Sequence, residues 1–82
     1  MKSKKLLLKI STGHYKNIKF REMQVLLEDI GFELKRVAGS HHIYARAGME
    51  EIVNIQNVGG DVKPYQVRQI VKLIERYDLA GD

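Results

Sequence analysis

The stretch Gly39-Ser40-His41-His42-Ile43-Tyr44 joins two predicted strands near the middle of this 82-residue chain. Its Gly-Ser turn brings two adjacent histidines to the start of the second strand. Glycine turns a chain at little steric cost, and histidine is the side chain that most readily exchanges protons near neutral pH. A histidine after a turn is more often a surface residue than a catalyst, so from the motif alone proton transfer is only a hypothesis.

The composition indicates a small globular protein. The apolar fraction of 44% and the charged fraction of 29% are ordinary, and this length suffices for one modest core, so we expect a single domain over residues 1–82. The chain has no cysteine, which excludes disulfides, and a cytoplasmic location fits best. Lys9 ends the longest apolar run, Leu6-Leu7-Leu8, so we expect neither a secretory leader nor a membrane span.

The chain is basic. Fourteen Lys and Arg residues against ten Asp and Glu residues give a formal net charge of +4. Such a charge favours polyanions such as RNA or DNA, or an acidic protein partner. The total charge does not choose among these partners.

Two helices are predicted before the motif. Residues 2–12 place Leu6, Leu7 and Ile10 at helical spacing, and Gly13 ends this segment. A second helix is predicted from residue 18 to about residue 30. Its core-facing stripe has a period of about 3.6 residues and consists of Phe20, Met23, Leu26, Leu27 and Ile30.

Three strands and a last helix follow. The predicted strands are Phe32 to Val37, His41 to Ala47 and Glu51 to Gln56, and their short connections make them an antiparallel meander. Residues 57–63 are predicted to be a polar loop. Pro64 then begins a helix, because proline is well tolerated in a first helical turn. Its predicted buried stripe is Val67, Ile70, Val71, Ile74 and Tyr77.

This order of elements predicts an α+β fold with helices packed on one face of a three-stranded antiparallel sheet. Residues 1–17 form an N-terminal extension helix in this scheme, and residues 18–78 form the core.

Several motifs together resemble the HicA family of toxins from bacterial toxin–antitoxin systems. The matching segments, within residues 18 to 78, are Gly31-Phe32, Arg36, Gly39-Ser40-His41-His42-Ile43-Tyr44, Asn54-Ile55-Gln56 and Lys63-Pro64-Tyr65-Gln66-Val67-Arg68-Gln69-Ile70. The resemblance implies a fold like that of a double-stranded RNA-binding domain (dsRBD-like). Many members of the family begin at the helix that we expect from about residue 20, so residues 1–17 depart from the pattern.

The resemblance also implies an activity and a partner. Members of the family are ribosome-independent endoribonucleases that cleave mRNA, held in check by a HicB-type antitoxin covering the active site. The histidine directly after Gly-Ser is the family's catalytic residue, which implies that role for His41. His42 is not implied to be catalytic.

The chemistry of RNA cleavage gives His41 a role as the base that deprotonates a ribose 2′-hydroxyl, which is typically worth about a hundred- to ten-thousand-fold in rate. Adjacent strand residues point to opposite faces, so we expect His42 to be a binding or structural residue. Arg36 is either a forked phosphate donor or a solvated strand charge. Tyr44 either stacks on a base or packs in the core, and packing is slightly favoured.

The remaining candidates are binding residues. We expect Gly39 to let phosphate approach the backbone and the Ser40 hydroxyl to bond backbone or phosphate, because no partners for a catalytic serine are recognisable. Lys63, Arg68 and Lys72 are candidate phosphate contacts on the last helix, together with Arg76. No His or carboxylate lies at ligand-like spacing from the two adjacent histidines, so neither a metal nor a cofactor is expected.

The combined prediction is a cytoplasmic endoribonuclease toxin without a cofactor, with RNA and an antitoxin as partners and His41 at its catalytic centre. The alternative is a non-catalytic RNA-binding module that uses the same sheet and basic helix. A third hypothesis is an interaction protein that has lost nuclease function and binds only an acidic antitoxin.

Overall fold

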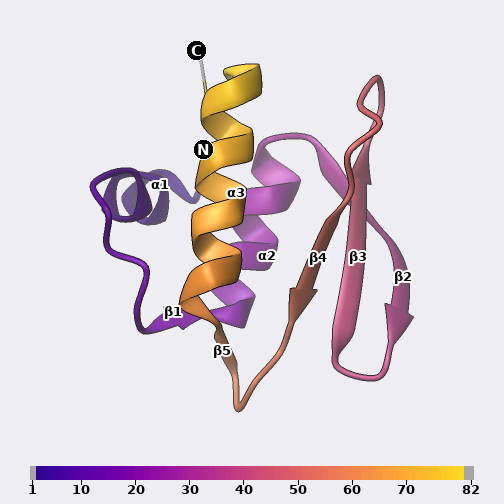
Figure 1. Ribbon diagram of the computed structural model, residues 1–82, viewed down its shortest axis with the longest axis horizontal. Coiled ribbons are helices and arrows are strands. Elements are labelled where there is room, and N and C mark those ends of the chain that lie inside the picture. Colours follow the sequence, from indigo (N-terminus) through magenta and orange to yellow (C-terminus); the bar gives the residue numbers. More distant parts are fainter. Residues whose placement is uncertain (1, 81–82) are drawn as a thin grey trace.

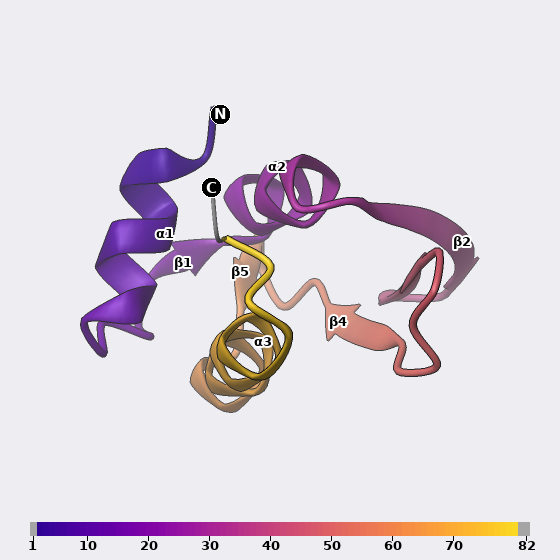
Figure 2. The ribbon, with the colours of Figure 1, turned by 90° about the horizontal axis from the view of Figure 1, so that it is seen from above.

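In the computed structural model, which describes residues 2–80, helices lie on one side of a three-stranded antiparallel sheet (Figure 1). The helices are α1 (Lys4–Ser11), α2 (Phe20–Asp29) and α3 (Pro64–Tyr77). The sheet has the order β2 (Phe32–Ala38), β3 (His41–Arg46), β4 (Val53–Gln56). Seen from above, α2 and α3 lie between α1 and the sheet (Figure 2). The predicted α+β, dsRBD-like architecture with an extra N-terminal helix is confirmed.

The predicted apolar stripes of α2 and α3 face the core, with one exception. Most of the stripe residues are less than 9% exposed: Phe20, Met23, Leu26, Leu27, Ile30, Val67, Ile70, Val71 and Ile74. The prediction that Tyr77 lies in the core was wrong, because the residue is 43% exposed. Its hydroxyl instead donates to the Glu51 carboxylate at the surface, near the end of α3.

A small two-stranded ribbon was not predicted. Ile18–Lys19 forms β1, which pairs antiparallel with β5 (Asp61–Val62), and Ile18 lies opposite Val62. Helix α2 therefore begins two residues later than expected, and the expected loop over residues 57–63 contains a strand. Ile18 and Val62 are both buried, so the ribbon extends the core beyond the main sheet.

The register of the main sheet fixes which side chains share a face. Tyr44 on β3 lies opposite Leu34 on β2 and Val53 on β4, and its burial marks this face as the one that the helices cover. A bulge between Leu34 and Arg36 shifts the pairing of β2 by one residue. The expected third strand over residues 51–56 begins only at Val53, because the pairing with β3 ends at the Tyr44–Val53 pair.

Helix α1 is tied to the end of α2 by one side chain. The backbone N–H of Ser3 donates to Asp29 Oδ2 over 3.0 Å, and its hydroxyl donates to the same oxygen over 2.7 Å. Bonds to the charged form favour it, so the Ser3 hydroxyl in particular lowers the pKa of Asp29. Leu6 and Ile10 complete the attachment, because both are buried in the common core.

The free edge of β4 is covered by a polar side chain from α3. Gln66 is only 5% exposed. The Gln56 N–H donates to Gln66 Oε1 over 3.0 Å, and Gln66 Nε2 donates to the Asn54 carbonyl over 3.4 Å. An amide here satisfies two main-chain groups that an apolar residue would leave unpaired, which explains a glutamine within the buried side of α3.

Candidate active site on the open face of the sheet

His41 is an exposed residue at the start of the central strand. The preceding turn consists of Gly39, which has a φ of +60°, and Ser40. A side chain at Gly39 would meet no other atom within 4 Å, so the turn requires glycine for its backbone conformation and not for space. His41 lies opposite Ala38 on β2 and Gln56 on β4, which places its ring on the face without helices.

Asn54 orients the His41 ring. His41 Nδ1 lies 3.2 Å from Asn54 Oδ1, and a carbonyl oxygen can only accept a hydrogen bond. The neutral ring therefore carries its proton on Nδ1 and keeps the lone pair on Nε2. An exposed Nε2 with a free lone pair is the arrangement that a general base needs.

Arg36 lies on the same open face. It is paired with Ile43, two residues after His41 on β3. The diagonal neighbours Arg36 and His41 are therefore separated by about 7–8 Å between their backbones, which a long side chain spans. Asn54 holds the matching diagonal position on β4, because it too lies opposite Ile43. The three residues come from three adjacent strands and form one cluster.

His42 points to the opposite face, as strand alternation predicts. Its ring packs edge-on against Phe20 of α2 with the ring centroids 4.6 Å apart. Its Nδ1 lies 3.2 Å from the Ser40 carbonyl, so this nitrogen carries a proton and donates it there. The Ser40 carbonyl also accepts from the Asn57 N–H, which joins the turn to the end of β4. His41 and His42 thus do not serve one common phosphate.

Tyr44 lies in the core and is only 1% exposed. Its hydroxyl accepts a hydrogen bond from Gln24 Nε2 over 3.0 Å. Burial raises the pKa of the Tyr44 phenol above its ordinary value. The inclusion of Tyr44 among the RNA contacts does not fit this structure, because the ring packs beneath the sheet and presents no face to a base.

The basic residues of α3 are exposed but spread along the helix. Lys63 is the N-cap of α3, and Arg68 lies in the N-terminal half of this helix. Lys72 lines a groove of about 310 Å³ between α3 and the edge of β4, together with Asn54. Arg76 lines the same groove and donates to Glu51 over 3.2 Å in an exposed, weak pair. Lys72 and Arg76 are thus the α3 cations that share a groove with Asn54, a member of the cluster.

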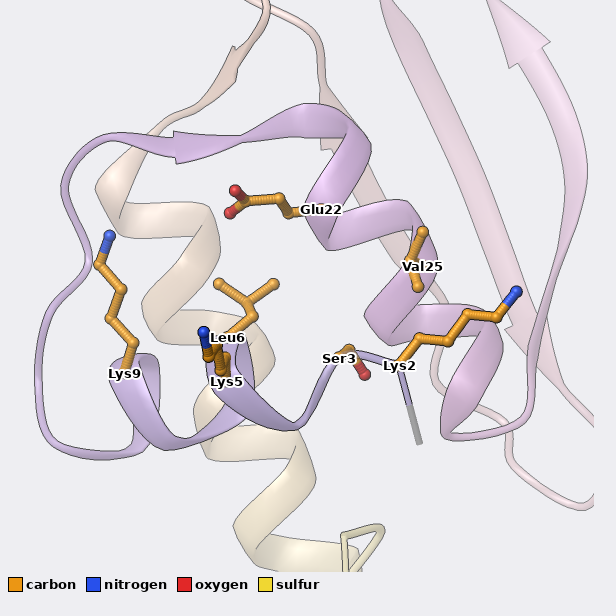
Figure 3. A pocket seen from close by; sticks show the side chains of 7 residues that line it. All are labelled: Lys2, Ser3, Lys5, Leu6, Lys9, Glu22 and Val25. Carbon is orange, nitrogen blue, oxygen red and sulfur yellow. The ribbon is translucent and has the colours of Figure 1, made fainter.

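A separate hollow lies on the far side of the helices from the sheet. It has a volume of about 370 Å³ and opens between α1 and α2 (Figure 3). Lys2, Lys5 and Lys9 extend around it, while Leu6 and Val25 supply its apolar wall (Figure 3). This hollow is remote from His41 and plays no part in the cluster.

Within residues 2–80, no three His, Asp or Glu side chains are gathered as metal ligands would be. In the same part of the chain, no helix is long and apolar enough to cross a membrane.

Two residues of this region were not recognised as site residues from the sequence. Asn54 stood in a quoted motif, but its contact with His41 depends on the register between β3 and β4. Gln66 offered a local signal, because it is a polar residue next to Val67 on the apolar side of α3.

Comparison with models of protein families identifies the family of this chain. Residues 20–75 match the family model described as the HicA toxin of bacterial toxin–antitoxin systems. The chain belongs to the HicA toxin family. No curated protein and no solved structure matches it. The HicA match begins at the first residue of α2, so α1 and β1 lie outside it. Membership makes this HicA-family chain the toxin partner of an antitoxin.

Proposed function

We propose that this HicA-family chain is an endoribonuclease that cleaves mRNA in the cytoplasm with His41 as its general base. The observation that carries the proposal is the contact between His41 Nδ1 and Asn54 Oδ1, which leaves Nε2 of an exposed ring unprotonated. The family match and the net charge of +4 support an RNA substrate.

The cluster suits attack by the ribose 2′-hydroxyl on the adjacent phosphorus. His41 Nε2 takes the hydroxyl proton while the new 2′-oxygen–phosphorus bond forms. The bond from phosphorus to the 5′-oxygen breaks, and that oxygen leaves with a proton from the solvent that reaches this exposed face. The products are a 2′,3′-cyclic phosphate and a 5′-hydroxyl, and no metal takes part.

Arg36 supports the charge that develops in this reaction. Its guanidinium is always protonated and presents several donors in a fixed fork, which fits the non-bridging oxygens of a phosphorane. Lys72 extends the positive charge along the groove beside β4. A HicB-type antitoxin covering the open face would block access of RNA to His41.

Induction of the chain in bacterial cells tests this function. The wild-type protein should arrest growth and degrade mRNA, while His41→Ala should do neither. His14→Ala is the matched control, because His14 is an exposed histidine in the loop after α1. Equal toxicity of the wild type and His41→Ala would exclude His41 as the base, and intact mRNA in arrested cells would exclude the nuclease.

A further inference from the structure

A pocket lined by two cationic side chains lies on the other side of the β2–β3 turn from His41. It has a volume of about 530 Å³ and is built from β1, α2, β3 and the loop before β5. The side chains that matter for its chemistry are Lys19, Arg21, Gln24, His42 and Asn57, with Phe20 behind the imidazole. None of these residues belongs to the His41 cluster.

The pocket is positively charged. Lys19 and Arg21 line it, and no carboxylate does. Lys19 pairs with Asp61 at 3.2 Å, but the two side chains are 64% and 41% exposed. An exposed pair of this kind is weak and readily exchanges its carboxylate for another anion. Arg21 is exposed and projects from the first turn of α2.

The uncharged polar groups of the pocket are held in place. His42 donates its Nδ1 proton to the Ser40 carbonyl and rests on Phe20, so its Nε2 is the nitrogen left for a ligand. Gln24 Nε2 donates to the Tyr44 hydroxyl, which leaves the amide oxygen of Gln24 for the pocket. This oxygen and His42 Nε2 are acceptors, so they suit a ribose hydroxyl or a base amino group, and the phosphate oxygens are left to the two cations. Groups fixed before binding lose little freedom when a ligand arrives.

His41 and His42 are adjacent, so the cluster and the pocket begin on opposite sides of the same turn. A ribonucleotide chain held at His41 reaches the pocket by passing around Gly39 and Ser40. We propose that the pocket binds a backbone phosphate of the substrate RNA close to the cleaved nucleotide, with Arg21 and Lys19 as its donors. This inference rests on the proposed function, because it assumes RNA at His41. Forked and single cationic donors together suit the oxygens of one phosphate.

Binding of a fluorescein-labelled single-stranded RNA, followed by anisotropy, tests the pocket. The measurement uses the His41→Ala protein, so that the RNA stays intact. Adding Arg21→Ala should weaken the affinity by about tenfold and reduce the salt dependence by about one unit of slope. Adding Lys4→Ala is the matched control, because it removes the same charge from the exposed surface of α1 and should change neither value.

Equal RNA affinities for the Arg21→Ala and Lys4→Ala proteins would overturn the proposal. Arg21-dependent binding of labelled poly-glutamate without binding of RNA would also overturn it and assign the pocket to an acidic protein partner. Cleavage assays separate the two hypotheses. An intact RNA with Arg21-dependent binding rejects the nuclease and keeps the pocket, whereas cleavage with an unchanged KM in Arg21→Ala rejects the pocket alone.

Discussion

At the scale of single residues, His41 depends on Asn54 for its protonation pattern. Replacing Asn54 by Ala removes the acceptor for Nδ1, so the ring can rotate and can place its proton on either nitrogen. One hydrogen bond is worth about 0.5–1.5 kcal/mol, so kcat should fall about two- to tenfold while KM stays nearly constant. Steady-state kinetics on a fluorogenic RNA measures both constants.

Nitrogen NMR of the His41 ring provides a readout that a merely structural role of Asn54 would not change. The wild-type neutral ring should be protonated on Nδ1, and Asn54→Ala should show a mixture of tautomers. Asn54→Asp keeps an acceptor at the same place and should restore the Nδ1 tautomer. A wild-type ring protonated on Nε2 would contradict the proposed role of this contact.

Single residues differed in how far their roles could be predicted. The Gly-Ser-His motif singled out His41 as the proposed catalytic residue, and strand alternation correctly predicted that His42 points to the other face of the sheet. Asn54 could not be selected, because a residue 13 positions away becomes a neighbour only through the pairing of β3 and β4. Tyr44 remained open between core and surface, since either face of a strand accommodates an aromatic side chain.

At the scale of secondary-structure elements, Gln66 fastens α3 to the edge of β4. Gln66→Leu leaves the Gln56 N–H and the Asn54 carbonyl without this partner. We expect a loss of about 1–3 kcal/mol in the free energy of unfolding, measured by urea denaturation with an unchanged m-value. Gln69→Leu is the control, because Gln69 lines the same groove but is exposed. Equal losses in both variants would show that the edge contact contributes nothing specific.

The attachment of α1 to α2 should depend on pH through Asp29. The hydrogen bonds from Ser3 lower its pKa below 3.8 in the folded state, so they stabilise the fold above that value. This contribution is lost as the pH falls from 3.8 through the lower folded-state pKa. Asn at this position keeps an acceptor but does not titrate. The advantage in Tm of the wild type over Asp29→Asn should therefore shrink across that acidic range, and a constant difference would contradict the assignment.

Periodicity was enough to predict the long elements, but not the short ones. The stripes of α2 and α3 repeat over several turns, so their burial could be predicted from apolar spacing alone. β1 and β5 have two residues each, which is too few to show an alternation of apolar and polar residues. Each is a strand only through its antiparallel pairing with the other. Tyr77 fitted the apolar spacing of α3, but its hydroxyl donates a hydrogen bond to the carboxylate of Glu51 at the surface near the end of the helix.

At the scale of the whole molecule, helices α2 and α3 separate the open face of the sheet from helix α1 (Figure 2). The open face of the sheet carries His41, Arg36 and Asn54, while α1 lies beyond α2 and α3 on the other side (Figure 2). The added helix therefore leaves the proposed catalytic face uncovered. The antiparallel pairing of β2, β3 and β4 could be predicted because their connections are short.

The most direct test of the central claim is the single-turnover rate at which the purified protein cleaves labelled RNA in the presence of a metal chelator. The wild type and His14→Ala should cleave equally fast. His41→Ala should bind the RNA with similar affinity but cleave it about a hundred- to ten-thousand-fold more slowly. Cleavage by His41→Ala at the wild-type rate would contradict the account.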